Sequence, residues 1–214
     1  TGSCMVLVTP DAERTMCTFL GATSQLDRHA LHPHDIAKSQ VYYMEGYLAA
    51  SPSGLEAAIE GLKIARQHGV QTALTLSDVS MINFCRAGLE AMLEGGLDYL
   101  FANEEEAQVW CASTDLEAIT TQLQTLARTV CLTRGPKGCI VLSAGQRIEV
   151  PAVLTQAVDT NGAGDMFAGS FLYGITHGQT AAQAAALANR TAAAVVSQHG
   201  NRLTREQMQA LRQG

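Results

Sequence analysis

The sequence predicts an α/β fold with a mainly parallel sheet flanked by helices. Apolar, strand-like segments alternate with segments of helical spacing between residues 40 and 133, which is typical of parallel strands joined by crossover helices. A strand pair joined by a short turn precedes this region and another follows it, and the last third of the chain has helical spacing. We expect one domain over residues 1–214, because hydrophobic residues make up 47% of the chain and no second core or linker is visible.

The N-terminal segments predict a hairpin and then a polar stretch. Residues 4–9 and 14–20 are strand-like and are joined by the turn sequence Pro10 to Glu13. The polar residues 27–39 are expected to form a loop or a short helix. The polarity of this stretch and its Pro33 favour a solvated loop over a metal site at its histidines, His29, His32 and His34.

The remaining elements are predicted from their apolar spacing. We expect strands at 40–48, 70–76, 97–102 and 129–133, alternating with helices at 53–68, 80–94, from 104 onward and at 115–127. Gly69 and the pair Gly95–Gly96 are the expected helix stops. An antiparallel pair at 139–143 and 147–150 should turn at Ala144–Gly145, and helices should cover 164–177, 180–199 and 204–212.

Composition and charge exclude several classes of partner. The net charge is −6 with no basic cluster, so neither nucleic acid nor an anionic membrane is an expected partner. No apolar run reaches the length of a membrane span, and no signal peptide is visible. The six cysteines form no C-x-x-C pair, so zinc is not expected, and most are interpreted as small buried hydrophobic residues in a reducing cytoplasm. Because the chain starts at Thr1, just before an apolar run, we expect an N-terminal portion upstream of it.

The most informative segment is Asp159-Thr160-Asn161-Gly162-Ala163-Gly164-Asp165. It has the pattern of a tight turn leading into a buried helix, where backbone amides and the positive end of the helix dipole favour an anion. The alternatives are a purely structural turn and a dinucleotide-binding fingerprint. Phe167 stands where that fingerprint has its third glycine, and no P-loop string occurs. An anion cradle beside the Asp165 carboxylate suits transfer of a phosphoryl group to a hydroxyl.

Polar residues also follow three of the expected parallel strands. These segments are Ser77–Asp78, Asn103–Glu106 and Thr133–Gly135. Ligands of open parallel sheets bind beyond the carboxyl ends of the strands, so these segments are candidate site residues.

Segment 159–165 resembles the signature of the ribokinase-like (PfkB) carbohydrate kinase family, and Asn161 makes it most similar to the adenosine kinase branch. The similarity covers nearly the whole chain, because further segments occur in the family's order: 1–14, Gly46–Tyr47, Asn103–Glu106, Thr133–Gly138 and Ala188–Asn189. The resemblance implies a ribokinase-like fold, in which residues 1–20 form the edge of a lid, and it implies the use of ATP and Mg²⁺.

The resemblance implies a role for each residue of the glycine turn. In this family the aspartate that closes the signature is the catalytic base, so Asp165 is expected to accept the proton of the substrate hydroxyl. The amides of Gly162, Ala163 and Gly164 would hold the charge that develops on the transferred group. Asp159 would help to order magnesium or a monovalent cation such as K⁺.

The resemblance also implies which residues bind the metal and the nucleotide. Asn103 and Glu106 match the family's N-x-x-E motif and would arrange Mg²⁺ with its waters; a helix N-cap with acidic first-turn residues is the alternative, and both roles can coexist. The residues expected to contact ATP are Thr133, Arg134, Gly135, Gly138, Asn161 and Asn189. Arg134 and Lys137 are equally well interpreted as solvated surface, and Asn189, expected near the adenine, as a helix-surface amide.

Two residues are expected to contact the acceptor substrate. Tyr47 matches an aromatic residue that stacks on the nucleoside base in adenosine kinases, with an ordinary strand-end tyrosine as the alternative. Arg14 matches an arginine of the lid region that would reach the phosphates.

The resemblance therefore implies an ATP-dependent kinase that phosphorylates a primary alcohol, the 5′-hydroxyl of adenosine or of a related nucleoside. The alternatives are a ribokinase- or fructokinase-type sugar kinase and an inactive nucleotide-binding fragment that needs its missing N-terminal part. The expected partner is a small nucleoside or sugar. An open sheet edge also invites pairing with another chain, and a partner chain that supplies the missing strands is a further alternative. A homodimer is a separate expectation.

Overall fold

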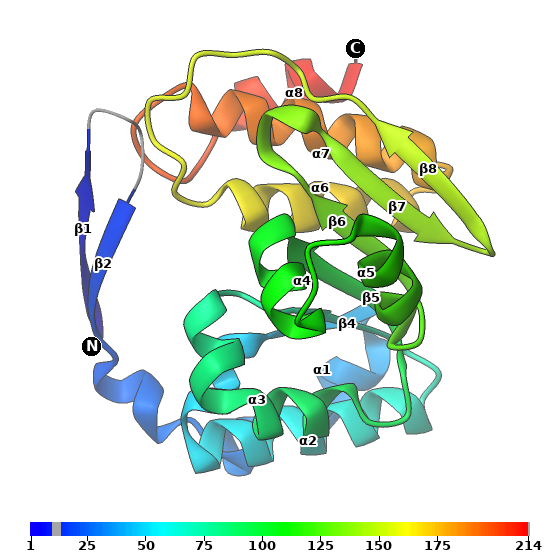
Figure 1. Ribbon diagram of the computed structural model, residues 1–214. Coiled ribbons are helices and arrows are strands. Elements are labelled where there is room, and N and C mark those ends of the chain that lie inside the picture. Colours follow the sequence, from blue (N-terminus) through cyan, green and yellow to red (C-terminus); the bar gives the residue numbers. More distant parts are fainter. Residues whose placement is uncertain (10–13, 214) are drawn as a thin grey trace. The chain divides into compact units, whose positions relative to one another are not determined.

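The computed structural model describes residues 1–9 and 14–213, without the side chains of Arg14 and Gln213 (Figure 1). Its strands are β1 (Ser3–Val8), β2 (Arg14–Phe19), β3 (Val41–Glu45), β4 (Gln71–Thr75), β5 (Leu97–Asn103), β6 (Ala127–Thr133), β7 (Cys139–Ser143) and β8 (Gln146–Val150). Its α-helices are α1 (Pro33–Lys38), α2 (Pro52–Gln67), α3 (Val79–Leu93), α4 (Glu104–Cys111), α5 (Leu116–Leu123), α6 (Ala163–Thr176), α7 (Ala181–Val196) and α8 (Arg205–Gln213). Short 3-10 helices lie at η1 (Gly21–Gln25), η2 (Arg28–Ala30), η3 (Gly46–Ala50) and η4 (Gly135–Lys137).

The strands form two sheets. β1 and β2 pair antiparallel with Cys4 opposite Thr18, and the other six strands are ordered β3-β4-β5-β6-β7-β8. β3, β4 and β5 run parallel, with Met44 opposite Leu74 and Leu74 opposite Leu100. The predicted α/β fold with a mainly parallel sheet is therefore confirmed.

The chain divides into two compact units, which are interleaved along the sequence. Unit 1 comprises residues 1–2, 20–132 and 142–145, and unit 2 comprises residues 3–19, 133–141 and 146–214. The expectation of a single domain is not tested by this division and stays a prediction. Among the described residues, no helix combines the length and the apolar character needed to cross a bilayer.

In unit 1, helices α2, α3, α4 and α5 contact one another in chain order, and α2 and α3 lie side by side in Figure 1. Helix α2 begins where the Ser51 side chain accepts a hydrogen bond from the Gly54 amide (3.1 Å) and ends just before Gly69, whose φ is +69°. The core includes Leu74 and Leu100, both fully buried on adjacent strands. Burying each such side chain stabilises the fold by roughly 1.5–3 kcal/mol.

In unit 2, helices α6 and α7 pack along each other, and α8 packs on α7 (Figure 1). The α6–α7 contact is close because small residues face each other: a Cβ on Gly174 would lie 2.8 Å from the Cβ of Ala184. The buried hydroxyl of Thr191 donates to the hydroxyl of Ser170 at 2.8 Å. The C-terminal helix is held in part by Arg212, whose guanidinium lies 4.4 Å from the ring centre of Tyr173.

The predicted elements all exist, but three of their ends were wrong. The strand predicted over 40–48 stops at Glu45, because the chain turns into η3 at Gly46. The helix predicted over 115–127 stops at Leu123, because Ala127 already belongs to β6. The helix predicted over 180–199 ends at Val196. The predicted hairpin is confirmed, whereas its turn at Pro10 to Glu13 lies outside the described residues.

The interpretation of most cysteines as buried hydrophobic residues was wrong. Only Cys131 and Cys139 are buried, Cys85 and Cys111 are half-buried, and Cys4 and Cys17 are exposed. The exposed pair, Cys4 and Cys17, lies on the β1–β2 hairpin. The local apolar pattern correctly indicated strands there, but it did not indicate whether their side chains are buried.

Candidate functional site

The glycine turn leads into helix α6 without a side-chain cap. Gly162 is the N-cap residue, with φ +77° and ψ 5°. A Cβ at this position would lie 2.6 Å from the Cβ of Asn201, so glycine is needed both for the left-handed backbone and for the close approach of the loop after α7. The loop residues Gly200 and Asn201 were not predicted from the sequence, where the only available signal was a glycine just beyond a helix.

The backbone donors at the start of α6 are largely open. The amide of Ala163 makes a long hydrogen bond to the Thr160 carbonyl (3.3 Å), and the amide of Met166 donates to the Gly162 carbonyl (2.9 Å). Within the described part of the chain, the amides of Gly162, Gly164 and Asp165 have no acceptor. These donors lie at the positive end of the α6 dipole, which favours an anionic group.

Gly164 provides space beside these donors. It is exposed, and a Cβ built on it would have no heavy atom within 4 Å. Nothing inside unit 2 therefore requires a glycine at this position of the helix, where alanine is the better helix former. A group that approaches the backbone from outside would require it.

Asp165 lies in the first turn of α6 with an exposed side chain. Its carboxylate makes no hydrogen bond or ion pair to any residue that the structure describes. The helix that carries it is firmly packed, because Phe167 and Phe171 on its other face are buried and stack at 6.4 Å between ring centres. The packed helix thus fixes the backbone of Asp165 next to the open amides, and its exposed carboxylate remains available to a ligand.

Asp159 holds the turn in shape. It is 5% exposed, and its two carboxylate oxygens accept hydrogen bonds from the backbone amides of Asn161 (2.9 Å) and Gly200 (3.0 Å). The predicted role of Asp159 in ordering a cation stays a prediction, since a carboxylate oxygen can accept more than one contact. Asn161 contributes its backbone amide here, and its side chain makes no hydrogen bond to a described residue.

The segment from Thr133 to Gly138 forms a compact turn after β6. The Arg134 amide donates to the Gly138 carbonyl at 2.8 Å, which closes the turn. Gly135 has φ +53° with no heavy atom near an added Cβ, so its backbone is open in the same way as that of Gly164. Gly138 differs, because a Cβ there would collide with the Val150 carbonyl. Arg134 and Lys137 both have interaction partners within the protein.

Asn189 lies on α7 and is only 8% exposed, so it is not a helix-surface amide. Its side-chain nitrogen donates to the carbonyls of Val150 (3.1 Å) and Pro151 (2.9 Å) at the end of β8. Gly138 and Asn189 therefore meet at the same backbone segment. Burial raises the pKa of the nearby Cys139 thiol to about 11, although a hydrogen bond with Asn189 opposes the rise. The predicted contact of Asn189 with adenine stays a prediction.

In unit 1, Asn103 and Glu106 form a capping box at the start of α4. The Glu106 amide donates to Oδ1 of Asn103 (2.7 Å), and the Glu106 carboxylate accepts from the Asn103 backbone amide (3.0 Å) and from its side-chain nitrogen (2.7 Å). Glu106 is 5% exposed. The N-cap interpretation is confirmed, whereas the magnesium role is not tested. No cluster of three or more His, Cys, Asp or Glu residues suited to a metal occurs in the described residues.

Gly46 and Tyr47 lie at the end of β3 and contact Ser77, which follows β4. The Gly46 amide donates to Oγ of Ser77 (2.8 Å), and the Tyr47 hydroxyl donates to the Ser77 carbonyl (3.4 Å). The Tyr47 side chain is 44% exposed. Of Arg14 only the backbone in β2 is described, so its side-chain role lies outside the described residues. The three histidines His29, His32 and His34 are exposed, as predicted, but they lie in η2, at the N-cap of α1 and in α1 instead of in a loop.

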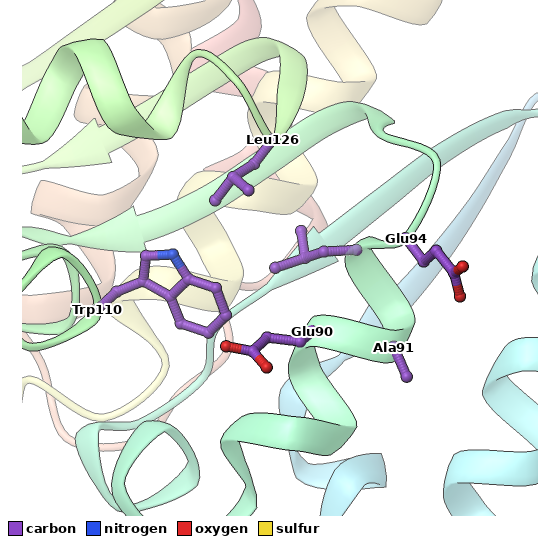
Figure 2. Close-up of a pocket in the computed structure, with 6 residues that line it drawn as sticks. Glu90, Ala91, Glu94, Trp110 and Leu126 are labelled. Carbon is purple, nitrogen blue, oxygen red and sulfur yellow. The ribbon is translucent and has the colours of Figure 1, made fainter.

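The pocket drawn in Figure 2 lies away from the predicted residues of unit 1. It has a volume of about 340 Å³ and is lined by Glu90, Ala91, Leu93, Glu94, Trp110 and Leu126. The end of α3 that lines it precedes β5, so it lies at the amino end of that strand, whereas Asn103 lies at its carboxyl end. None of the site residues predicted from the sequence lines this pocket.

Comparisons with known proteins agree with the fold and with the family resemblance. The chain is 31% identical over 205 residues to an uncharacterized sugar kinase of Escherichia coli (strain K12), an alignment that covers 93% of this chain and 62% of the relative. It is 30% identical over 195 residues to an adenosine kinase of Saccharomyces cerevisiae, covering 84% of this chain and 56% of that protein. The crystal structure of adenosine kinase from Sinorhizobium meliloti is 37% identical with a TM-score of 0.94, and the match covers 100% of this chain and 66% of that one.

This chain thus spans between about half and two thirds of the length of these relatives. The family model described as pfkB family carbohydrate kinase matches residues 1–208, nearly the whole of the chain. With the glycine turn, the capping box and the parallel sheet in place, this match shows that the chain belongs to the pfkB family of carbohydrate kinases.

Proposed function

We propose that the protein is an ATP-dependent kinase that phosphorylates a primary hydroxyl, and that its acceptor is the 5′-hydroxyl of adenosine or of a related nucleoside. The observation that carries the proposal is the start of α6, where open backbone amides stand beside the free carboxylate of Asp165 and the bare backbone of Gly164. Membership of the pfkB family supports a kinase.

In the proposed reaction, Asp165 accepts the proton of the acceptor hydroxyl as its oxygen attacks the γ-phosphorus of ATP. A new oxygen–phosphorus bond forms, the bond to the β,γ-bridging oxygen breaks, and ADP leaves with that oxygen. The amides of Gly162, Ala163 and Gly164 hold the negative charge that develops on the transferred group. General-base assistance of this kind contributes typically about 10²–10⁴-fold.

The proposed nucleotide contacts are divided between backbone and side chains. Thr133 and the open backbone of Gly135 would contact the phosphates or ribose, and Arg134 would add positive charge. Gly138 would act by shaping this turn, since its own Cβ position is filled by the Val150 carbonyl. Asn161 and Asn189 would complete the site, Asn189 by fixing the backbone at Val150 and Pro151.

The residues proposed for Mg²⁺ fit an ion that keeps its waters. The oxygens of Asn103 and Glu106 are hard ligands of the kind that magnesium prefers, but they are already engaged with each other. They would therefore hold the ion through its water shell, and the bound ion would supply positive charge to the phosphates. Asp159 is proposed as a second cation contact, for magnesium or K⁺, in addition to its structural hydrogen bonds.

The choice of adenosine rests on Tyr47 and on the relatives. The Tyr47 side chain is 44% exposed and its hydroxyl donates to the Ser77 carbonyl, and its proposed role is to stack on the nucleoside base. Two of the compared proteins are named adenosine kinases. A sugar kinase is the second candidate, because the E. coli relative with 31% identity is described as one. Arg14 is proposed as a phosphate contact from the lid.

The experiment is a kinase assay on the natural polypeptide that contains these 214 residues. ADP release is measured with ATP and Mg²⁺ in the presence of adenosine, of ribose or of fructose, and the product is identified by phosphorus NMR. Phosphorylation of adenosine at the 5′ position supports the proposal, and phosphorylation of a sugar alone replaces it with the second candidate. Binding of ATP without turnover of any acceptor would show a nucleotide-binding protein instead. Sedimentation of the same sample tests the expected homodimer.

A further inference from the structure

Ser77 has a left-handed backbone that its residue type does not favour. Its φ is +72°, and the other non-glycine residues with positive φ in the described part of the chain are Ala112 and Ala144. Such a conformation strains any residue with a Cβ, and it persists where the surroundings hold it in place. Here the Ser77 amide donates to Oγ1 of Thr75 (3.3 Å) and its hydroxyl donates to the Thr75 carbonyl (3.3 Å).

The left-handed turn directs both polar groups of Ser77 to the end of β3. Its Oγ accepts the Gly46 amide at 2.8 Å, and its carbonyl accepts the Tyr47 hydroxyl at 3.4 Å. The two segments pack so closely that a Cβ on Gly46 would lie 2.6 Å from the Leu76 carbonyl oxygen. Ser77 thus holds both the backbone next to Tyr47, through the Gly46 amide, and the hydroxyl end of the Tyr47 side chain.

We propose that Ser77 is a positioning residue for the acceptor substrate, which it orients by holding Tyr47. This inference rests on the proposed function, in which Tyr47 stacks on the nucleoside base. Ser77 itself touches neither the acceptor nor ATP in this scheme. Its loss should therefore weaken the binding of the acceptor and leave the nucleotide side and the chemical step unchanged.

The test uses Ser77→Gly, because glycine accepts the positive φ and lacks the hydroxyl together with its Cβ. In the natural polypeptide, KM for the nucleoside should rise about 3- to 10-fold, the effect of one lost hydrogen bond, while kcat and KM for ATP stay within about 2-fold. The Gly46 amide should exchange its hydrogen faster. Ser77→Ala removes the same hydroxyl but keeps the strained backbone. It should therefore show the same change in KM for the nucleoside and a lower Tm than Ser77→Gly.

Two controls separate this role from a general loss of stability. Ala112→Gly changes another residue of positive φ, and Ser143→Ala removes a hydroxyl that pairs with Thr129 at 2.9 Å. Neither should change KM for the nucleoside. An unchanged nucleoside KM in Ser77→Gly, or an equal rise in both KM values, overturns the positioning role alone. Absence of nucleoside phosphorylation by the unaltered protein overturns the proposed function, and the positioning role with it.

Discussion

Helices α4 and α6 both begin with an acidic first turn, but the two starts are built in opposite ways. At α4 the donors are closed internally, since Asn103 and Glu106 satisfy each other and Glu106 is 5% exposed. At α6 the N-cap is Gly162 without a side-chain cap, three amides have no acceptor among the described residues, and Asp165 is exposed. Helix α7 also has a capping box, formed by Thr180 and Gln183.

This difference distinguishes a structural helix start from a candidate ligand site, although both first turns contain acidic residues. A side-chain N-cap stabilises a helix by roughly 0.5–2 kcal/mol, and α6 forgoes that stabilisation. The donors that a cap would satisfy are left for a ligand, while the buried face of the helix and the Asp159 hydrogen bonds keep them in place. The closed start of α4 needs no ligand in order to be stable.

The largest expected effect is that of Asp165→Asn. The amide cannot accept the hydroxyl proton, so kcat should fall at least about 10²-fold. ATP should still bind within about 3-fold of the original affinity, because the backbone amides remain. The matched control is Glu105→Gln, which removes the same charge from the exposed first turn of α4 and should leave kcat unchanged. Steady-state kinetics and calorimetric ATP titration measure both quantities, and an unaltered kcat in Asp165→Asn would contradict its role as the base.

Gly164→Ala tests whether the open space at the start of α6 is used by a ligand. The structure has room for the methyl group, so the fold should gain up to about 0.5–1 kcal/mol of stability from better helix propensity. If the transferred phosphoryl group approaches this backbone, kcat/KM for ATP should nevertheless fall about 10- to 10²-fold, because the methyl group would displace it.

Gly169→Ala is the control for this prediction on the same helix. Gly169 is exposed and also has no heavy atom within 4 Å of an added Cβ, so it should gain similar stability without loss of activity. Thermal unfolding and initial rates distinguish the two variants. Equal activity of both would mean that no ligand uses the space beside Gly164.

The sequence predicted those features that depend on local pattern. Such local signals exist for the glycine turn, for the acidic start of α4 and for the hairpin turn at Ala144–Gly145. In that hairpin turn both residues have a positive φ, 51° and 74°, as a tight turn between antiparallel strands requires. The helix end at Leu123 was missed, because the apolar spacing continues into Ala127, whose strand membership depends on pairing with another strand.

Features that depend on distant partners could not be predicted in this way. Nothing near Asn189 indicates that its amide is held by carbonyls 38 and 39 residues away. The two oxygens of Asp159 are likewise divided between a neighbour and Gly200, 41 residues away. Ser77 was recognised as a polar residue at a strand end, but nothing near it in the sequence indicates its positive φ or its hydrogen bond with the Gly46 amide, 31 residues away.

The smallest expected effect is that of Glu106→Gln, which asks whether the closed start of α4 also serves the metal. Glutamine retains one acceptor of the capping box and loses the other, so stability should fall by about 1 kcal/mol and Tm by about 2–4 °C. Gln183→Ala opens the equivalent box at α7 and is the control for the loss of a cap alone. If Glu106 also holds the water shell of Mg²⁺, the concentration of magnesium for half-maximal activity should rise about 3- to 10-fold in Glu106→Gln and stay constant in Gln183→Ala. A lower Tm in both variants without a shift in the magnesium titration would show that the capping box of α4 stabilises the helix and does not serve the metal. The start of α4 would then be structural, and only the start of α6 would bind a ligand.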